Sequence, residues 1–290
     1  MSDTLDQLPP LPPLRQQRRG LGALRAAFRT AGRIAPGATA RVAEALFFKT
    51  SRPAPREEEE AFLATASRFE VRAAGQTIAG YRWGAGGPLI LFAHGWWSSA
   101  GRFAALADSV LAAGGQAVAF DAAGHGRSSG WRSSMPEFAA SLRAVVHHVG
   151  PVRAVVGHSL GGAAAIFALS RGLPAERAVV IAAPSDLPAW AHRFRDAAGL
   201  SPGVYSRMQR NMERRLRVTW QDLEIPVAAR LLRLPGLVIH DIHDPDVPWT
   251  EGENIAAAWP GSELLTTHGL GHRAILRDPE VIRRVLEFVL

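Results

Sequence analysis

A serine flanked by glycines is the first candidate for chemistry in this sequence. Residues 157–161 (GHSLG) follow the apolar run 152–156 and precede an alanine-rich stretch. A serine at a sharp turn from a strand into a helix is held at strained backbone angles, and glycines on both sides leave room for that turn. The pattern predicts that Ser159 is a nucleophile and that the N–H of Leu160, at the start of the helix, faces a developing oxyanion.

A second oxyanion donor is expected after another apolar run, at residues 89–93. The segment 94–97 (HGWW) follows that run, and the backbone N–H of Trp96 is the candidate donor. His94 is expected to form structural hydrogen bonds instead of acting as a base. The Trp97 indole is a candidate for the wall of a substrate pocket, with ordinary packing as the alternative.

A serine hydroxyl needs a base to accept its proton, and the base needs an acid to orient it. Two segments near the end of the chain supply these groups: 240–248 (HDIHDPDVP) and 267–272 (THGLGH). The first offers three carboxylates and the second offers two histidines. The same His/Asp cluster could be read as a metal site, but neighbours on one loop point in different directions. We therefore expect neither a metal nor a cofactor.

Five segments, in this order, resemble the α/β-hydrolase superfamily. They are HGWW (94–97), FDAAGHGRS (120–128), GHSLGG (157–162), HDIHDPDVP (240–248) and GLGH (269–272). The resemblance covers about residues 70–290. It implies an α/β fold with a mostly parallel twisted sheet, helices on both faces and a helical cap insertion.

The resemblance also implies a catalytic triad in the chain order serine, acid, histidine. It places the acid at Asp244 and the base at His272, with Asp186 and His268 as the alternatives. Asp241 and Asp246 are then surface or turn-capping residues. The activity that it implies is hydrolysis of a carboxylic ester or a related small acyl compound, without a cofactor. Thioesterase, C–C hydrolase, acyltransferase and perhydrolase reactions use the same triad, and a non-catalytic ligand-binding protein is the alternative from another class.

The elements that must position these residues can be read from the hydrophobic pattern. From about residue 68, short apolar runs alternate with helical stretches, which is typical of a mostly parallel sheet covered on both faces. The predicted strands are 68–74, 76–83, 88–93, 116–120, 152–156, 178–181, 236–240 and 263–267. The predicted helices in the same region lie near 99–113, near 135–149, from residue 160 onward, and at 278–289.

Residues 187–233 interrupt this alternation and are predicted to form the helical cap. Its large apolar residues either line a pocket for the substrate or pack the cap helices onto the domain; they are Trp190, Tyr205, Met208, Met212 and Trp220. Seven arginines between residues 193 and 217 make the cap basic. Most of them are expected on its solvated face, and one that faced inward would favour an anionic substrate.

The start of the chain differs in composition from the rest. Residues 1–37 are predicted to be a flexible Pro- and Arg-rich extension, 38–67 a pair of helices, and 68–290 the main domain. As a helix, residues 15–34 would be basic and amphipathic, a form that can bind anionic membranes weakly. Three glycines weaken that helix, so we favour an arm folded over the domain.

Composition excludes several classes of protein. The 290 residues contain no cysteine, which rules out disulfides and Cys-ligated metals. The 33 basic residues are 32 Arg and one Lys, and the net charge is +7; no nucleic-acid-binding motif accompanies this charge, so nucleic acid is not an expected partner. No apolar run reaches a membrane-spanning length and no signal-peptide core is visible, so we predict a cytoplasmic protein. The sequence does not indicate an oligomeric state.

Overall fold

The computed structural model describes residues 18–290, with side chains from residue 22 onward. The predicted flexibility of residues 1–17 lies outside this part of the chain. The chain divides into two compact units. The helical unit combines the residues up to Lys49 with Asp186–Glu224, and the sheet unit combines Thr50–Ser185 with Ile225–Leu290.

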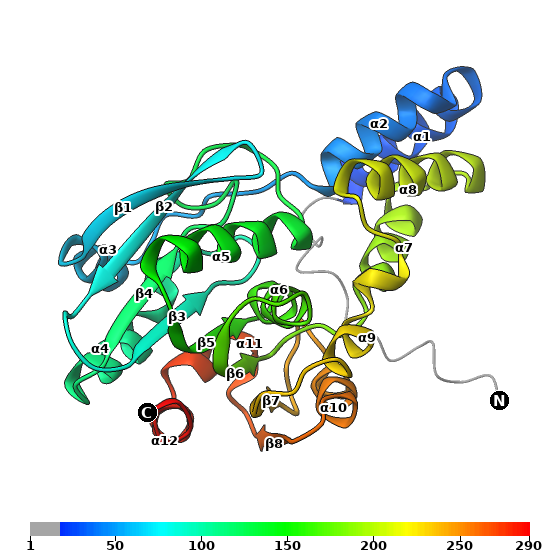
Figure 1. Cartoon of the computed structure of the whole chain (residues 1–290). Helices are drawn as coiled ribbons and strands as arrows, with labels where there is room; N and C mark the ends of the chain where they lie inside the picture. Colours follow the sequence, from blue (N-terminus) through cyan, green and yellow to red (C-terminus); the bar gives the residue numbers. More distant parts are fainter. Residues whose placement is uncertain (1–17) are drawn as a thin grey trace. The chain divides into compact units, whose positions relative to one another are not determined.

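The sheet unit is built on eight strands in the order β1-β2-β4-β3-β5-β6-β7-β8 (Figure 1). The hairpin β1–β2 is antiparallel and β2 runs antiparallel to β4, whereas all other neighbours are parallel. The predicted strands and the mostly parallel sheet are confirmed. The strands are β1 (Ser67–Ala73), β2 (Gln76–Trp83), β3 (Leu89–Ala93), β4 (Gln116–Phe120), β5 (Val152–His158), β6 (Ala175–Ile181), β7 (Gly236–Asp241) and β8 (Ser262–Thr267).

Burial explains the continuous apolar sequences of the central strands. Every residue of β3, β4 and β7 is buried, so neither face of these strands meets water. The helices that cover the sheet are α3 (Glu57–Ala64), η2 (Ala100–Phe103), α4 (Ala104–Ala112), α5 (Met135–Val149), α6 (Leu160–Leu169), α9 (Ile225–Ala229), α10 (Trp249–Ala258), α11 (Gly271–Ala274), η4 (Ile275–Arg277) and α12 (Pro279–Val289).

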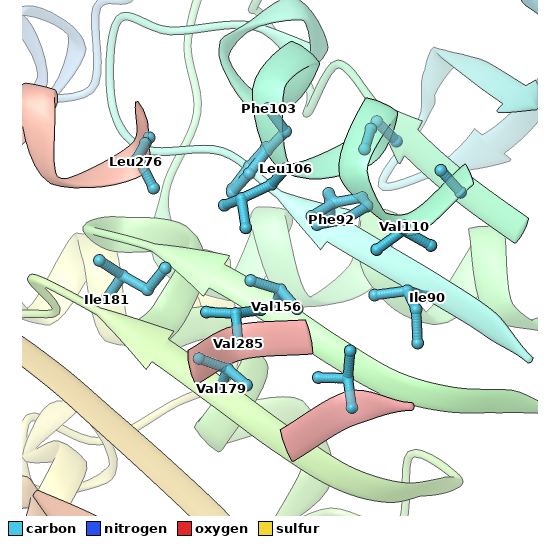
Figure 2. Packing of buried hydrophobic residues seen from close by; sticks show 14 of the residues in the cluster. Ile90, Phe92, Phe103, Leu106, Val110, Val156, Val179, Ile181, Leu276 and Val285 are labelled. Atoms are coloured by element: carbon cyan, nitrogen blue, oxygen red, sulfur yellow. The ribbon is translucent and has the colours of Figure 1, made fainter. Parts of the chain in front are cut away.

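A core of aliphatic and aromatic side chains holds one layer of helices on the sheet (Figure 2). Phe103 and Leu106, from η2 and α4, lie among this core with Phe92 of β3. On α12, Val281, Val285 and Val289 recur every four residues and are all fully buried. This spacing places them on one face of the helix, which explains why α12 packs as an amphipathic helix.

The helical unit joins two segments that are far apart in the sequence. Its elements are α1 (Arg18–Ile34), α2 (Pro36–Phe47), α7 (Leu187–Ala198), α8 (Pro202–Leu216) and η3 (Gln221–Leu223). Phe28 of α1 is buried in the same cluster as Met208 and Met212 of α8. The guanidinium of Arg25 donates to the Ala197 carbonyl at 2.8 Å. Residues from the start of the chain therefore form the cap together with the insertion.

The two units have other bounds than the predicted domains. The prediction divides the chain at residue 37, whereas the structure divides it after Lys49 and forms a helix from Arg18. Tertiary packing offsets the low helix propensity of glycine here, because a Cβ at Gly32 would lie 3.1 Å from the Val204 side chain. The glycine allows α1 to pack closely against α8.

The insertion is also shorter than the predicted 187–233. The Ile225 N–H donates to the Ser185 carbonyl at 2.9 Å, so the chain re-enters the sheet unit at that residue and α9 belongs to the sheet unit. Within residues 18–290, none of the helices has the length and apolar character that a bilayer crossing needs.

Candidate active site

Ser159 sits at the turn between β5 and α6 with a left-handed backbone, at φ 52° and ψ −127°. Glycines make this turn possible. A Cβ at Gly157 would lie 2.6 Å from the Gly162 Cα, and one at Gly161 would lie 2.2 Å from the Ala93 carbonyl oxygen. The sequence therefore folds into a strained turn that presents the serine at the carboxyl end of a central strand.

Asp244 and His272 form a buried hydrogen-bonded pair. The Nδ1 of His272 lies 2.8 Å from Oδ2 of Asp244. The other oxygen, Oδ1, accepts the N–H groups of Asp246 at 2.8 Å and Val247 at 2.9 Å. Both carboxylate oxygens thus have fixed partners, which orients the imidazole and favours the tautomer with its proton on Nδ1.

Ser159 and His272 line one small cavity of about 60 Å³ in the sheet unit. Its other lining residues are Gly95, Trp96, Trp97, Ser98, Arg102, His158 and Arg273. A larger depression of about 570 Å³ lies elsewhere in this unit, around Arg82 and Trp83, and contains none of the candidate residues. Of these two cavities, the smaller one is lined by the candidate nucleophile and the candidate base.

The remaining carboxylates considered from the sequence have other partners. Asp241 accepts the Leu270 N–H and the Thr267 hydroxyl, both at 2.9 Å, and so holds the loop that leads to His272. Burial alone would raise the pKa of Asp241, but these hydrogen bonds outweigh it and the pKa is lowered. Asp246 pairs with Arg273 at 3.2 Å. Asp186 caps α7 in the helical unit, where it accepts the Ala189 N–H at 3.0 Å.

The alternative histidines also have other surroundings. His268 is exposed, and its ring lies 6.3 Å from that of His243. His94 is fully buried; its Nδ1 lies 2.7 Å from the Gly95 carbonyl and its Nε2 accepts the Ala122 N–H at 2.9 Å. Burial lowers the pKa of His94 to about 4, so this histidine is neutral at pH 7. It connects the loop after β3 to the loop after β4.

The segments that carry the two candidate oxyanion donors, Leu160 and Trp96, lie beside the serine. Leu160 begins α6, and the first N–H groups of a helix have no partner within the helix. Trp96 lies in the loop after β3, which approaches closely because a Cβ at Gly95 would be 2.8 Å from the Ser159 Cβ. The Trp96 ring packs on His125 at 5.1 Å, which restrains this loop. Both candidate donors therefore lie on segments that contact the serine.

His158 is a residue that sequence reasoning missed. Its Nε2 lies 2.8 Å from the His272 carbonyl oxygen, and the two rings are 4.7 Å apart. Burial lowers the pKa of His158 well below its ordinary value, and the electrostatic effect of the neighbouring His272 lowers it further. The neutral ring donates to the backbone of the candidate base. The two residues are 114 positions apart in the sequence, so no local pattern predicts this contact.

The predicted pocket residues of the cap separate into two groups. Tyr205, Met208 and Met212 are at most 7% exposed and pack in a core of the helical unit with α1 and α2. Trp220 packs against the same core, and the Trp190 ring lies under the Arg193 guanidinium at 4.8 Å. The first three thus pack in a core, which is the second of the two alternatives that the sequence left open. By contrast, Trp97 does line the cavity, with 46% of its surface exposed and a left-handed φ of 52°.

Among the described residues, no three His, Cys, Asp or Glu side chains are arranged to hold a metal ion. In the His/Asp cluster after β7, the Nε2 of His240 lies 3.0 Å from the Val247 carbonyl oxygen. The cluster therefore orders its own loop.

Comparisons with known proteins identify the family of the chain. The profile of the family described as "Serine aminopeptidase, S33" matches residues 87–285. A monoacylglycerol lipase of Mycolicibacterium smegmatis is 36% identical over 106 residues, 33% of this chain and 38% of that protein. A bifunctional esterase/perhydrolase of Acinetobacter calcoaceticus is 39% identical over 101 residues, 33% of this chain and 37% of that protein. The chain thus spans little more than a third of the length of these curated relatives.

Solved structures share the fold over a longer stretch. An esterase of Pyrococcus furiosus has a TM-score of 0.65 at 20% identity, covering 83% of this chain and 97% of its own. An esterase of Rhodococcus sp. ECU1013 has a TM-score of 0.58 at 21% identity, covering 77% and 98%. At these identities the likeness shows a common fold.

Proposed function

Because the chain belongs to the serine aminopeptidase S33 family of α/β hydrolases, we propose that it is a serine hydrolase that cleaves a carboxylic ester or a related acyl compound. The observation that carries the proposal is the hydrogen-bonded pair of Asp244 and His272 at the cavity that Ser159 also lines. The curated relatives named as a lipase and an esterase support an ester as the substrate.

The proposed reaction has two halves. In the first, the Ser159 Oγ bonds to the acyl carbon while His272 takes its proton, and collapse of the tetrahedral intermediate expels the alcohol with that proton. In the second, His272 takes a proton from water, the hydroxide attacks the acyl-enzyme, and the acid leaves as Ser159 regains its proton. The N–H groups of Trp96 and Leu160 hold the oxyanion in both halves.

Asp244 has an orienting task in this scheme. With Oδ1 held by two backbone N–H groups and Oδ2 on the imidazole, the carboxylate stabilises the imidazolium that forms in each half-reaction. His158 donates to the backbone carbonyl oxygen of His272. The side chain and the backbone of the proposed base therefore each have a hydrogen-bond partner.

The same triad can use other substrates in either half of the reaction. In the first half, a thioester can replace the ester as the acyl donor. In the second half, hydrogen peroxide in place of water would give a peracid, and an alcohol would give acyl transfer. The relative named as an esterase/perhydrolase makes perhydrolysis the alternative that a named observation supports.

Labelling with a fluorophosphonate, together with a series of p-nitrophenyl esters of increasing acyl length, tests the proposal. Wild type and Ser206→Ala, which changes an exposed serine of the cap, should label and turn over. Ser159→Ala should do neither, with a rate lower by about a million-fold. Normal labelling of Ser159→Ala would show that another residue is the nucleophile.

A further inference from the structure

The positive charge of the chain is concentrated in the helical unit. Of the 33 basic and 26 acidic residues in the sequence, 15 basic and 8 acidic lie in this unit. Its net charge is therefore +7, equal to that of the whole chain. The sheet unit has 18 residues of each sign and no net charge.

The two units also differ in how their arginines are partnered. In the described part of the sheet unit, eight arginines form ion pairs with Asp or Glu: Arg56, Arg102, Arg127, Arg153, Arg273, Arg277, Arg283 and Arg284. In the helical unit, two of the eleven arginines with described side chains do so, Arg195 and Arg215. Six exposed arginines of this unit make none of the ion pairs found among the described residues: Arg29, Arg33, Arg41, Arg207, Arg210 and Arg217. The sheet unit also has exposed arginines outside these pairs, among them Arg68, Arg72 and Arg230, but its acidic residues equal its basic residues in number. The excess positive charge therefore belongs to the helical unit.

The helices α1 and α2 form a hairpin (Figure 1). Apolar side chains are exposed along both of these helices. Phe28 is buried, but Leu24, Ala27, Ala31 and Ile34 follow a spacing of three and four residues along α1 and are all exposed. Val42 and Leu46, four residues apart on α2, are exposed as well. Ile34 is 79% exposed and Val42 is 54% exposed, and each directly follows an exposed arginine in the sequence.

We propose that the hairpin of α1 and α2 docks the helical unit on the surface of an anionic lipid bilayer. The apolar side chains enter the boundary between headgroups and acyl chains, and the unpaired arginines lie among the lipid phosphates. A helix of this kind binds through buried apolar area together with electrostatic attraction. Guanidinium groups also bind phosphate oxygens in a bidentate geometry.

The observations favour a bilayer over two other partners. A nucleic acid would attract the arginines but would leave Ile34 and Val42 in water. A second copy of the chain would cover the apolar residues but would bring two units of charge +7 together. An anionic bilayer has negatively charged headgroups outside and an apolar layer beneath them. It can therefore bind both the exposed arginines and the exposed apolar side chains of the hairpin.

Sedimentation of the full-length protein with vesicles tests the proposal. Binding to phosphatidylcholine vesicles with about 30% phosphatidylglycerol should exceed binding to pure phosphatidylcholine at least about tenfold at low salt. Raising NaCl from about 0.05 M to about 0.5 M should release most of the protein, because salt screens the attraction. Equal binding to both vesicles would contradict the proposal.

Matched variants separate a docking surface from a general charge effect. Replacing Arg29, Arg33 and Arg41 by Gln should lower the partition coefficient on the order of a hundredfold, at about fivefold for each arginine. Replacing Arg68, Arg72 and Arg230 of the sheet unit by Gln removes the same charge and should change binding less than about twofold. A loss as large in this second variant would overturn the proposal.

The apolar residues need their own variant. Ile34→Ser with Val42→Ser should lower vesicle binding about tenfold without changing the salt dependence. Replacing the three hairpin arginines by Lys should retain most of the binding, and circular dichroism checks that every variant is folded.

Two results would name another partner and so contradict the proposal. One is duplex DNA bound more tightly than vesicles, with no effect of the two serine substitutions. The other is a dimer of the wild type that these substitutions dissociate while vesicle binding stays absent. Because binding is read without turnover, each result leaves the proposed hydrolase function untouched.

Discussion

Three carboxylates lie close together after β7, and each is held by different partners. Asp244 contacts His272, Asp241 fixes the loop that carries His272, and Asp246 pairs with the exposed Arg273. At the scale of single residues the structure thus assigns them separate tasks: one orients an imidazole, one supports a loop, and one forms a surface pair of small energetic value.

The first prediction concerns the orienting carboxylate. Asp244→Asn should lower turnover of a p-nitrophenyl ester on the order of ten-thousandfold, because the amide favours the wrong imidazole tautomer. Asp246→Asn should stay within a few-fold. The measurement is kcat for both folded variants, and near-normal kcat in Asp244→Asn would place the acid elsewhere.

The second prediction concerns the buried His94. Its pKa is about 4 in the folded protein, below its ordinary value of 6.5, so between these values the unfolded chain binds a proton that the folded chain does not. Stability is therefore present above pH 6.5 and is lost as the pH falls toward 4, by about 3 kcal/mol for this group.

Urea unfolding between pH 7 and 4.5 measures this loss. His94→Gln can keep one donor and one acceptor but does not titrate, so its stability should fall less steeply across that window. The same pH dependence in both proteins would assign the acid sensitivity to other groups.

At the scale of elements, the close approach of α6 to β3 decides where the serine stands. A Cβ on Gly161 would meet the carbonyl oxygens of Ala93 and His94 at 2.2 and 2.4 Å, and backbone atoms cannot rotate away as a flexible side chain can. Only a glycine at position 161 therefore allows α6 to lie this close to β3. The position of the candidate oxyanion donors depends on this close approach.

We accordingly predict that Gly161→Ala lowers the free energy of unfolding by about 1–3 kcal/mol or more. Ester turnover should fall with it, because the N–H groups of Leu160 and Trp96 move apart. Gly86→Ala is the matched control, since a Cβ there meets nothing within 4 Å. Urea midpoints equal to wild type for Gly161→Ala would mean that α6 can shift freely.

At the scale of the whole molecule, the start of the chain is part of the cap. The sequence predicts that residues 1–37 are a dispensable appendage, but Phe28 is buried in the core of the helical unit and Arg25 bonds to the end of α7. The candidate triad and oxyanion residues, by contrast, belong to the sheet unit. The two units therefore respond differently to truncation.

Deleting residues 1–37 should destabilise the helical unit while leaving the sheet unit folded. Limited proteolysis should cut the truncated protein within residues 186–224 much faster than wild type, and a fluorophosphonate should still label Ser159. Phe28→Ala should act in the same direction, at a cost of about 3 kcal/mol or more to the helical unit. Unchanged proteolysis after deletion would show that α1 is not part of the cap core.

The sequence by itself determined the sheet and the turn that carries Ser159. Short apolar runs at regular intervals specify buried strands, and the glycines around Ser159 specify the strained turn, because both are local consequences of side-chain size and backbone freedom. The carboxyl ends of parallel strands then lie at one edge, which places the segments after β3, β5, β7 and β8 together. The choice of Asp244 as the acid and His272 as the base came from the family resemblance. Spacing alone did not distinguish among the three carboxylates and two histidines in these segments.

Only the tertiary structure decided which groups meet across long separations. The contact of His158 with the His272 backbone and the burial of Phe28 beside α8 each join residues more than a hundred positions apart, where the pattern along the chain carries no information. The helix at Arg18–Ile34 forms against the preference of its glycines because packing against α2 and α7 outweighs propensity. Packing also decided between the two alternatives for Met208 and Met212: they lie in a core together with residues of α1 and α2.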